Sequence, residues 1–193
     1  MARIGMKHPV WAELVKETPG QMPTYGTGVV IGAAISGTVT INRNNTELYA
    51  DDALKESDNG ATGGTIALEV DDVADEELAT MTGATRNEDG SIDLTGDPSP
   101  YGGYGYIEER SINNVKSYSA IWFFKVMLGQ SSINAQTRGQ NTSYATTTLD
   151  GTLSTAVPAA DMKNHLWRRK SFSKLEEAFA WLDGLANITN TAA

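Results

Sequence analysis

The sequence has no cysteine, only 2 histidines and no long apolar run. Without cysteine there is no disulfide, no thiolate nucleophile and no cysteine-ligated metal site. His8 and His165 lie far apart in the sequence and lack the close spacing of a zinc-binding pair, so we expect both to be surface or packing residues. No stretch approaches the roughly 20 apolar residues of a membrane span, and residues 1–9 lack a signal-peptide core. We therefore expect a protein made in a cytoplasm, with no membrane segment, metal or cofactor.

Catalytic motifs are missing as well. There is no Gly-x-Ser-x-Gly elbow, and neighbours such as Asp51-Asp52 or Asp71-Asp72 would point to opposite faces of a strand instead of converging as a dyad. The glycine-rich run at residues 101–106 precedes a strand-like segment and not a helix, so it lacks the helix N-terminus of a phosphate site. We interpret it as a mobile turn with aromatic anchors. The sequence predicts no enzyme.

The formal net charge of -9 is unevenly distributed. Residues 51–110 hold 16 Asp and Glu residues against 3 bases, whereas the rest of the chain holds 8 acids and 12 bases. Because acidic domains repel phosphate, we expect no specific nucleic-acid binding. The charge either serves solubility or lets an acidic face meet a basic one. The basic cluster Arg168, Arg169 and Lys170 is either a solvated strand end or the partner of such an acidic neighbour.

Alternating apolar residues indicate a mainly β (α+β) fold. At 193 residues the chain fits a single domain, 1–193, with a flexible tail from about residue 187. Strands are expected at residues 28–41, 65–70, 104–110 and 118–128, with a hairpin turn at Asp150-Gly151. We expect a β-sandwich or barrel-like sheet with one or two short flanking helices.

Two helices are expected to cover the sheet. The first spans about residues 73–82, with Asp72 as N-cap and Gly83 as the C-terminal stop. The second follows a capping box at Ser173 to Glu176, and Gly184 ends it. Its apolar stripe consists of Leu175, Ala178, Phe179 and Leu182.

Residues 42–64 form a polar segment that we expect to be a long inter-strand loop. At about 20 residues it exceeds the roughly 12–15 at which loops are uncommon unless functional or disordered. Disorder is one interpretation. Because Leu48, Tyr49 and Leu54 supply apolar side chains, an interaction loop is the other.

The 4 tryptophans offer a second functional interpretation. Trp122 and Trp181 lie in apolar patterns typical of a core, whereas Trp11 and Trp167 are expected on exposed faces. Together with the tyrosines of residues 101–106, these two could form a sugar-stacking platform. The alternative function is therefore a carbohydrate-binding β-sandwich module.

The order of features resembles a known family. Tyr25-Gly26 precedes a glycine-containing strand at residues 28–41; then come residues 48–52 (Leu-Tyr-Ala-Asp-Asp), Gly63-Gly64, residues 70–73 (Val-Asp-Asp-Val) and a short helix ending at Gly83. Residues 149–152 (Leu-Asp-Gly-Thr) and the helix at residues 176–182 extend the match. This order is similar to that of the major tail proteins of long-tailed, non-contractile bacteriophages (siphophages), which build the tail tube.

The resemblance implies a structural virion protein, made in a bacterial host cytoplasm and located in the phage tail. Its copies would form hexameric rings that stack into a tube, with other tail proteins at the tube ends. DNA would pass through the lumen without specific binding.

Two sets of residues are candidates for assembly contacts. We expect residues 42–64 to reach the adjacent ring through Leu48, Tyr49, Asp51, Asp52 and Leu54. We expect Arg168, Arg169 and Lys170 to pair with acidic residues of a neighbouring subunit, while part of the 51–110 segment faces the lumen or these bases.

Overall fold

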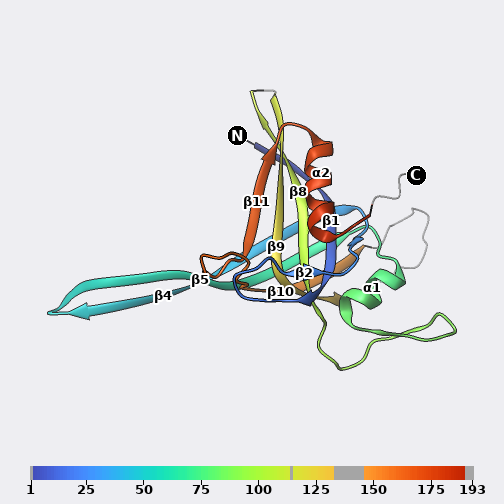
Figure 1. The fold of residues 1–193 in the computed structure, drawn as a ribbon, viewed down its shortest axis with the longest axis horizontal. Helices are drawn as coiled ribbons and strands as arrows, with labels where there is room; N and C mark the ends of the chain where they lie inside the picture. The colour runs from blue at the N-terminus through green and yellow to red at the C-terminus, as the bar shows by residue number, and fades with distance from the viewer. Residues whose placement is uncertain (1, 114, 133–145, 190–193) are drawn as a thin grey trace, which may run out of the picture.

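The computed structural model describes residues 2–113, 115–132 and 146–189. It has a nine-stranded antiparallel sheet and two short helices, which confirms the mainly β fold expected from the alternating pattern (Figure 1). The strands of this sheet are β1 (Ala2–Lys16), β2 (Thr24–Tyr25), β3 (Val29–Val30), β4 (Ala34–Ala50), β5 (Ala53–Val70), β8 (Tyr101–Ile112), β9 (Val115–Ser132), β10 (Thr147–Ser154) and β11 (Trp167–Phe172). A small second sheet pairs β6 (Thr85–Arg86) with β7 (Ile92–Asp93), and the helices are α1 (Asp75–Thr82) and α2 (Leu175–Ala186).

Strand β9 is the centre of the main sheet because two strands share one of its edges. β11 pairs with β9 up to Phe123, and β10 pairs with it from Lys125 onward. Between these two stretches the register with β8 shifts, so β9 carries a bulge. The Tyr25 hydroxyl donates to the Phe124 carbonyl at the bulge, over 2.7 Å. The bulge bends β9 and lets the two ends of the strand carry different neighbours.

The curled sheet encloses two apolar clusters. The first lies on its concave side and draws on β1, β5, β8, β9, β10 and α1; its members include Trp11, Leu68, Met81, Phe123, Leu128 and Leu149. The second lies beneath α2, which packs on β1, β8, β9 and β11, and includes Val10, Ile107, Trp122, Phe124, Ala178 and Leu182. The bulge in β9 explains why Phe123 and Val126 face the same cluster although they are three positions apart.

The glycines of residues 101–106 make room for aromatic side chains, so the prediction of a mobile turn is wrong. These residues lie inside β8 and pair with β1 and β9. A Cβ at Gly102 would lie 2.3 Å from the Trp11 ring, and one at Gly103 would lie 2.1 Å from Trp122 Cζ2. A strand without side chains at these points lets both indoles lie flat against its backbone.

The Asp150-Gly151 pair does not form the predicted turn. Both residues lie in the middle of β10, where they pair with Ala67 and Ile66 of β5 on one side and with Gly129 and Leu128 of β9 on the other. Pairing along both edges of the strand outweighs the local preference of Asp-Gly for a turn.

The two helices match the bounds and caps predicted from the sequence only in part. α1 ends at Gly83 with φ 74°, as expected, but its N-cap is Ala74, and Asp72 instead accepts from the Val73 amide. α2 packs through its predicted apolar stripe. However, Lys174 is its N-cap without a side-chain cap, and the helix continues through Gly184 to Ala186, with Asn187 at its end.

The four last residues of the expected flexible tail, 190–193, lie outside the described residues. No helix in the described part of the chain has the length and apolar character to cross a bilayer.

The glycines of β8 give a stability test. We expect Gly103→Ala to lower the free energy of unfolding by about 1–3 kcal/mol, the usual cost of overpacking a core, because its Cβ would overlap the Trp122 ring. Gly184→Ala is the matched control. It lies in a helix with nothing within 4 Å of its Cβ, so it should be neutral or stabilise the protein by up to about 1 kcal/mol. Equal effects of the two variants in denaturant melts would contradict the packing described.

Candidate assembly surface

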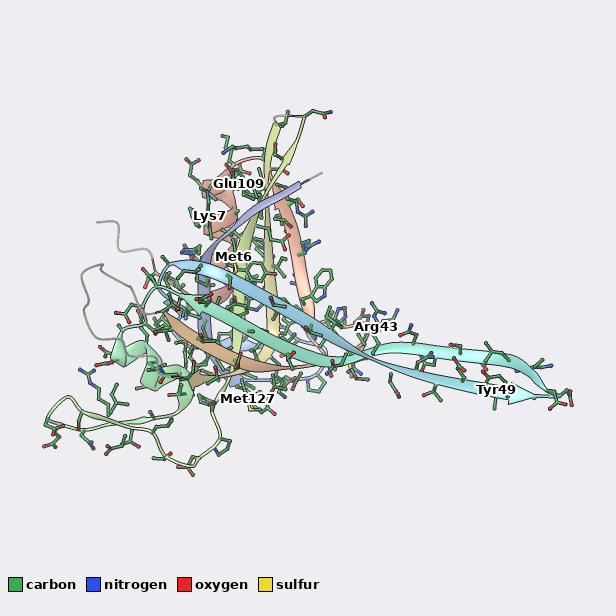
Figure 2. All side chains as sticks on the ribbon, turned by 180° about the vertical axis from the view of Figure 1, so that it is seen from behind. Met6, Lys7, Arg43, Tyr49, Glu109 and Met127 are labelled. Atoms are coloured by element: carbon green, nitrogen blue, oxygen red, sulfur yellow. The ribbon has the colours of Figure 1, made fainter. Side chains whose placement is uncertain are left out.

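Residues 42–64 are not a loop but the outer half of a long β-hairpin. β4 and β5 pair continuously from Ala34↔Val70 to Ala50↔Ala53, and the hairpin leaves the body near Arg43 and ends close to Tyr49 (Figure 2). We call residues 42–62 the arm. The prediction of a loop is wrong because backbone pairing needs no apolar alternation, and a ribbon that is polar on both faces gives no period-two signal. Side-chain hydrogen bonds such as Ser57 to Asn45 also link its strands.

A tight turn places two acids at the end of the arm. Asp51 and Asp52 connect β4 to β5 with φ values of 52° and 56°. Positive φ at both central residues is the feature of the type I′ turn that suits the twist of a hairpin, and Asp tolerates this conformation better than most residues. The two acids therefore lie in the turn at the tip of the arm.

The predicted contact residues lie together at the tip and are exposed. Tyr49 pairs with Leu54 across the hairpin, and Leu48 pairs with Glu56. Their exposed fractions are 57% for Leu48, 63% for Tyr49 and 54% for Leu54. Every residue of the arm is exposed. A single two-stranded layer has no second layer in which to bury these side chains, and such ribbons are only marginally stable alone in water.

Two of the longer strands, β4 and β11, leave an edge open along their length. Among the described residues, β4 pairs only with β5, and β11 pairs only with β9. Open edges present unpaired backbone donors and acceptors, which invite the addition of another strand. Both edges lie beside the same hollow in the body.

A groove of about 550 Å³ lies between β4 and β11, and we call it the β4–β11 groove. Its floor comes from neighbouring rows of the sheet: Tyr106, Ile121 and Arg169 lie in register across β8, β9 and β11. The ring of Phe123 stacks with that of Tyr106, with centroids 6.2 Å apart. The other lining residues are Gly5, Met6, Gly37, Thr38, Val39, Ile41, Glu108 and Trp167. Trp167 is 40% exposed and Ile41 is 37% exposed, so the groove has an apolar rim as well as an aromatic floor.

Strand alternation separates the three bases that were expected to act together. Arg169 lines the β4–β11 groove. Arg168 instead lies over the Phe124 ring, and Lys170 lies over Phe172, both on the side of the sheet that α2 covers. The three bases therefore belong to two faces of β11, and only Arg169 borders the groove.

The acids of residues 51–110 divide into two groups. Those of the arm are exposed, as are Asp75 and Glu76 of α1, whereas Glu108 and Glu109 are buried in the body beside bases. Glu108 Oε2 lies 2.9 Å from Arg110 and 3.5 Å from Arg169. Two guanidinium groups therefore share this carboxylate, and Arg169 is the base that lines the groove.

Glu109 lies between two lysines on the opposite face of β8. Lys116 Nζ and Lys7 Nζ each lie 2.7 Å from one of its carboxylate oxygens. Hydrogen bonds and charge attraction from Lys116 and then from Lys7 lower the pKa of Glu109 to about 2. These pairs join β8 to β1 and to β9.

Two of the five predicted members of the sugar-stacking platform are buried. Trp11 is 1% exposed, so the expectation that it lies on an exposed face is wrong, and Tyr104 is also 1% exposed. The glycines of β8 that accept the Trp11 ring are the reason. Trp167 and Tyr101, each 40% exposed, remain at the surface.

The histidines are packing or surface residues, as expected. His8 packs edge-on against Phe179 and lies 2.6 Å from Asp183, which joins β1 to α2. His165 lies 3.4 Å from Asp161 in a loop. In the described part of the chain, no group of three or more His, Cys, Asp or Glu residues could hold a metal ion.

No protein-family model matches the sequence, and no curated protein matches it either. The features that bear on function are therefore the exposed arm and the β4–β11 groove.

Sequence reasoning identified the tip of the arm, but it missed the groove. The groove's residues come from five separate strands, and the only local signal was the alternation of Val39 and Ile41.

Glu109 gives a prediction for acid stability. Its folded pKa of about 2 lies below the ordinary value of 4.5, so its pairs stabilise the fold fully above pH 4.5, and this contribution is lost as the pH falls toward 2. We expect Glu109→Gln to be less stable than the parent at pH 7, with the difference shrinking between pH 4.5 and 2. Denaturant melts across this range would show it. Glu88→Gln, at an exposed loop position, is the control; a constant difference for Glu109→Gln would contradict the account.

Proposed function

We propose that this chain is a structural subunit that assembles with copies of itself through its arm. The observation that carries the proposal is a fully exposed hairpin ending in Leu48, Tyr49 and Leu54. Tyr49 and Leu54 form a cross-strand pair, Leu48 lies on the other face of the ribbon, and such exposed apolar side chains are costly unless another surface covers them. No described segment of the same chain packs over the tip, since all residues of 42–62 are exposed.

The energetics favour many arms acting together over a single contact. Full burial of a leucine contributes about 1.5–3 kcal/mol, so the tip supplies several kcal/mol at most. Association costs about 4–15 kcal/mol in lost translational and rotational freedom. One arm is therefore too weak to hold a pair of subunits, but repeated arms in a closed ring or stack raise the effective concentration of each contact.

The assembly we propose is the tail tube of a siphophage, in hexameric rings that stack. The support is the resemblance of residues 25–83 to major tail proteins, together with a mainly β body and a long arm that extends away from it (Figure 1). In this proposal the arm reaches the adjacent ring, other tail proteins bind at the tube ends, and genomic DNA passes through the lumen without specific binding.

One face of the sheet suits the passage of DNA. The outer side of β4, β5, β10 and β9 presents hydroxyls and one carboxylate in register: Thr40, Thr65 and Thr152 in one row, and Thr38, Ala67 and Asp150 in the next. The described residues along this strip include no lysine or arginine. A surface without bases does not retain phosphate, so we assign this face to the lumen.

Removal of the arm tests the proposal. Replacing residues 44–60 with Asn-Gly closes the hairpin at the Arg43↔Ala61 pair with a favoured turn. We expect this variant to keep the thermal unfolding transition of the parent, because the removed residues are exposed. In electron micrographs it should give only single rings or monomers that do not lengthen.

A point variant supplies the control. Leu54→Ser at the tip should reduce lengthening, whereas Leu94→Ser, at a position 67% exposed in the loop before β8, should not. Tubes of normal length from the arm-replaced protein would contradict the proposal.

A further inference from the structure

We propose that the β4–β11 groove of one copy receives the arm tip of a second copy. This inference rests on the proposed function and names the surface that the arm binds. It follows from three observations: the shape and polarity of the groove, the charges of both surfaces, and the direction of the arm.

The groove and the tip both expose apolar side chains and open strand edges. The groove has an aromatic and aliphatic floor between two open strand edges, with Ile41 and Trp167 exposed at its rim. The tip presents Tyr49 beside Leu54, on a ribbon whose own outer edges are unpaired among the described residues. A hairpin end that enters the groove would cover apolar side chains of both surfaces and could pair with the edge of β4 or β11.

The charges are complementary. Close to the tip, the arm carries Glu47, Asp51, Asp52 and Glu56 against the single base Lys55. In the groove, the guanidinium of Arg169 lies 3.5 Å from Glu108, whose carboxylate also lies 2.9 Å from Arg110, so Glu108 is shared between two bases. Arg169 lines the groove and is the base that we expect to face the acids of the tip.

The occupant must be a second copy. Val39 and Ile41, which line the groove, lie on β4 just before the arm begins, and the arm extends straight away from the body (Figure 2). The arm cannot fold back into its own groove without breaking the pairing of β4 with β5. Because tip and groove are different surfaces, a copy whose groove is filled still has a free tip, so the contact can repeat head-to-tail from copy to copy until it closes or extends.

Engineered cysteines can detect this contact directly, because the chain has no cysteine of its own. Leu54→Cys and Trp167→Cys proteins are purified separately, mixed, allowed to assemble and oxidised. We expect a disulfide-linked dimer that forms only in the mixture. A second pair, Asp52→Cys with Ile41→Cys, keeps Tyr49, Leu54 and Trp167 intact. Leu54→Cys mixed with Leu94→Cys is the control and should give no dimer.

Charge reversal provides an independent measurement. Arg169→Glu should raise the protein concentration needed for assembly by about tenfold, as expected for the loss of one close charge pair. Asp52→Arg in the same chain should restore part of that loss. Arg168→Glu is the matched control on the opposite face of the same strand, and it should leave the assembly concentration unchanged.

The outcomes separate the two proposals. If particles assemble but neither cysteine pair cross-links, the groove is not the receptor, while assembly through the arm still stands. If Arg168→Glu weakens assembly as much as Arg169→Glu, the charge assignment is wrong and the groove proposal falls with it. If the unmodified protein forms no particles at all, both proposals fail.

Discussion

The continuous pairing of β4 with β5 is the interaction on which the rest of the structure depends. Inside the body this ladder supplies Leu68 and Val70 to the concave core and Val39 and Ile41 to the β4–β11 groove. Beyond Arg43 the same ladder continues as the arm. The register shifts at Asn42/Arg43, where the arm begins, but the pairing resumes beyond that point, so the same two strands carry the groove residues and the tip.

The bulge in β9 is the second constraint, since it allows β10 and β11 to share one edge of a single strand. β10 carries the sheet onward to β5 and β4, whereas β11 ends it, and the groove opens between the two branches. The buried Tyr25 hydroxyl bonds the Phe124 carbonyl where the branches separate. The features proposed for assembly, an open edge, an apolar groove and a projecting ribbon, follow from this branching and from the β4–β5 ladder.

The sequence predicted those parts whose signal is local. The alternation of Ile66, Leu68 and Val70 gave a strand, Gly83 gave a helix end, and the stripe from Leu175 to Leu182 gave the face of α2. It also singled out Leu48, Tyr49 and Leu54, which the structure leaves exposed on the arm.

Predictions from local sequence signals failed where residues far apart in the sequence determine the structure. The arm has no apolar period because both of its faces meet solvent. The glycines of β8 are explained only by the rings of Trp11 and Trp122, which occupy the space where their side chains would lie. Asp150-Gly151 stays extended because strands pair with it on both sides. The split of Arg169 from Arg168 and Lys170 required the register of β11 on β9.

The central claim is that this chain is a subunit of a larger assembly and not a finished monomer. Negative-stain electron microscopy of the purified, unmodified protein at micromolar concentration tests it most directly. The account predicts rings or tubes whose neighbouring subunits are joined by their arms. A uniform population of single small particles, unchanged as the protein is concentrated, would contradict it.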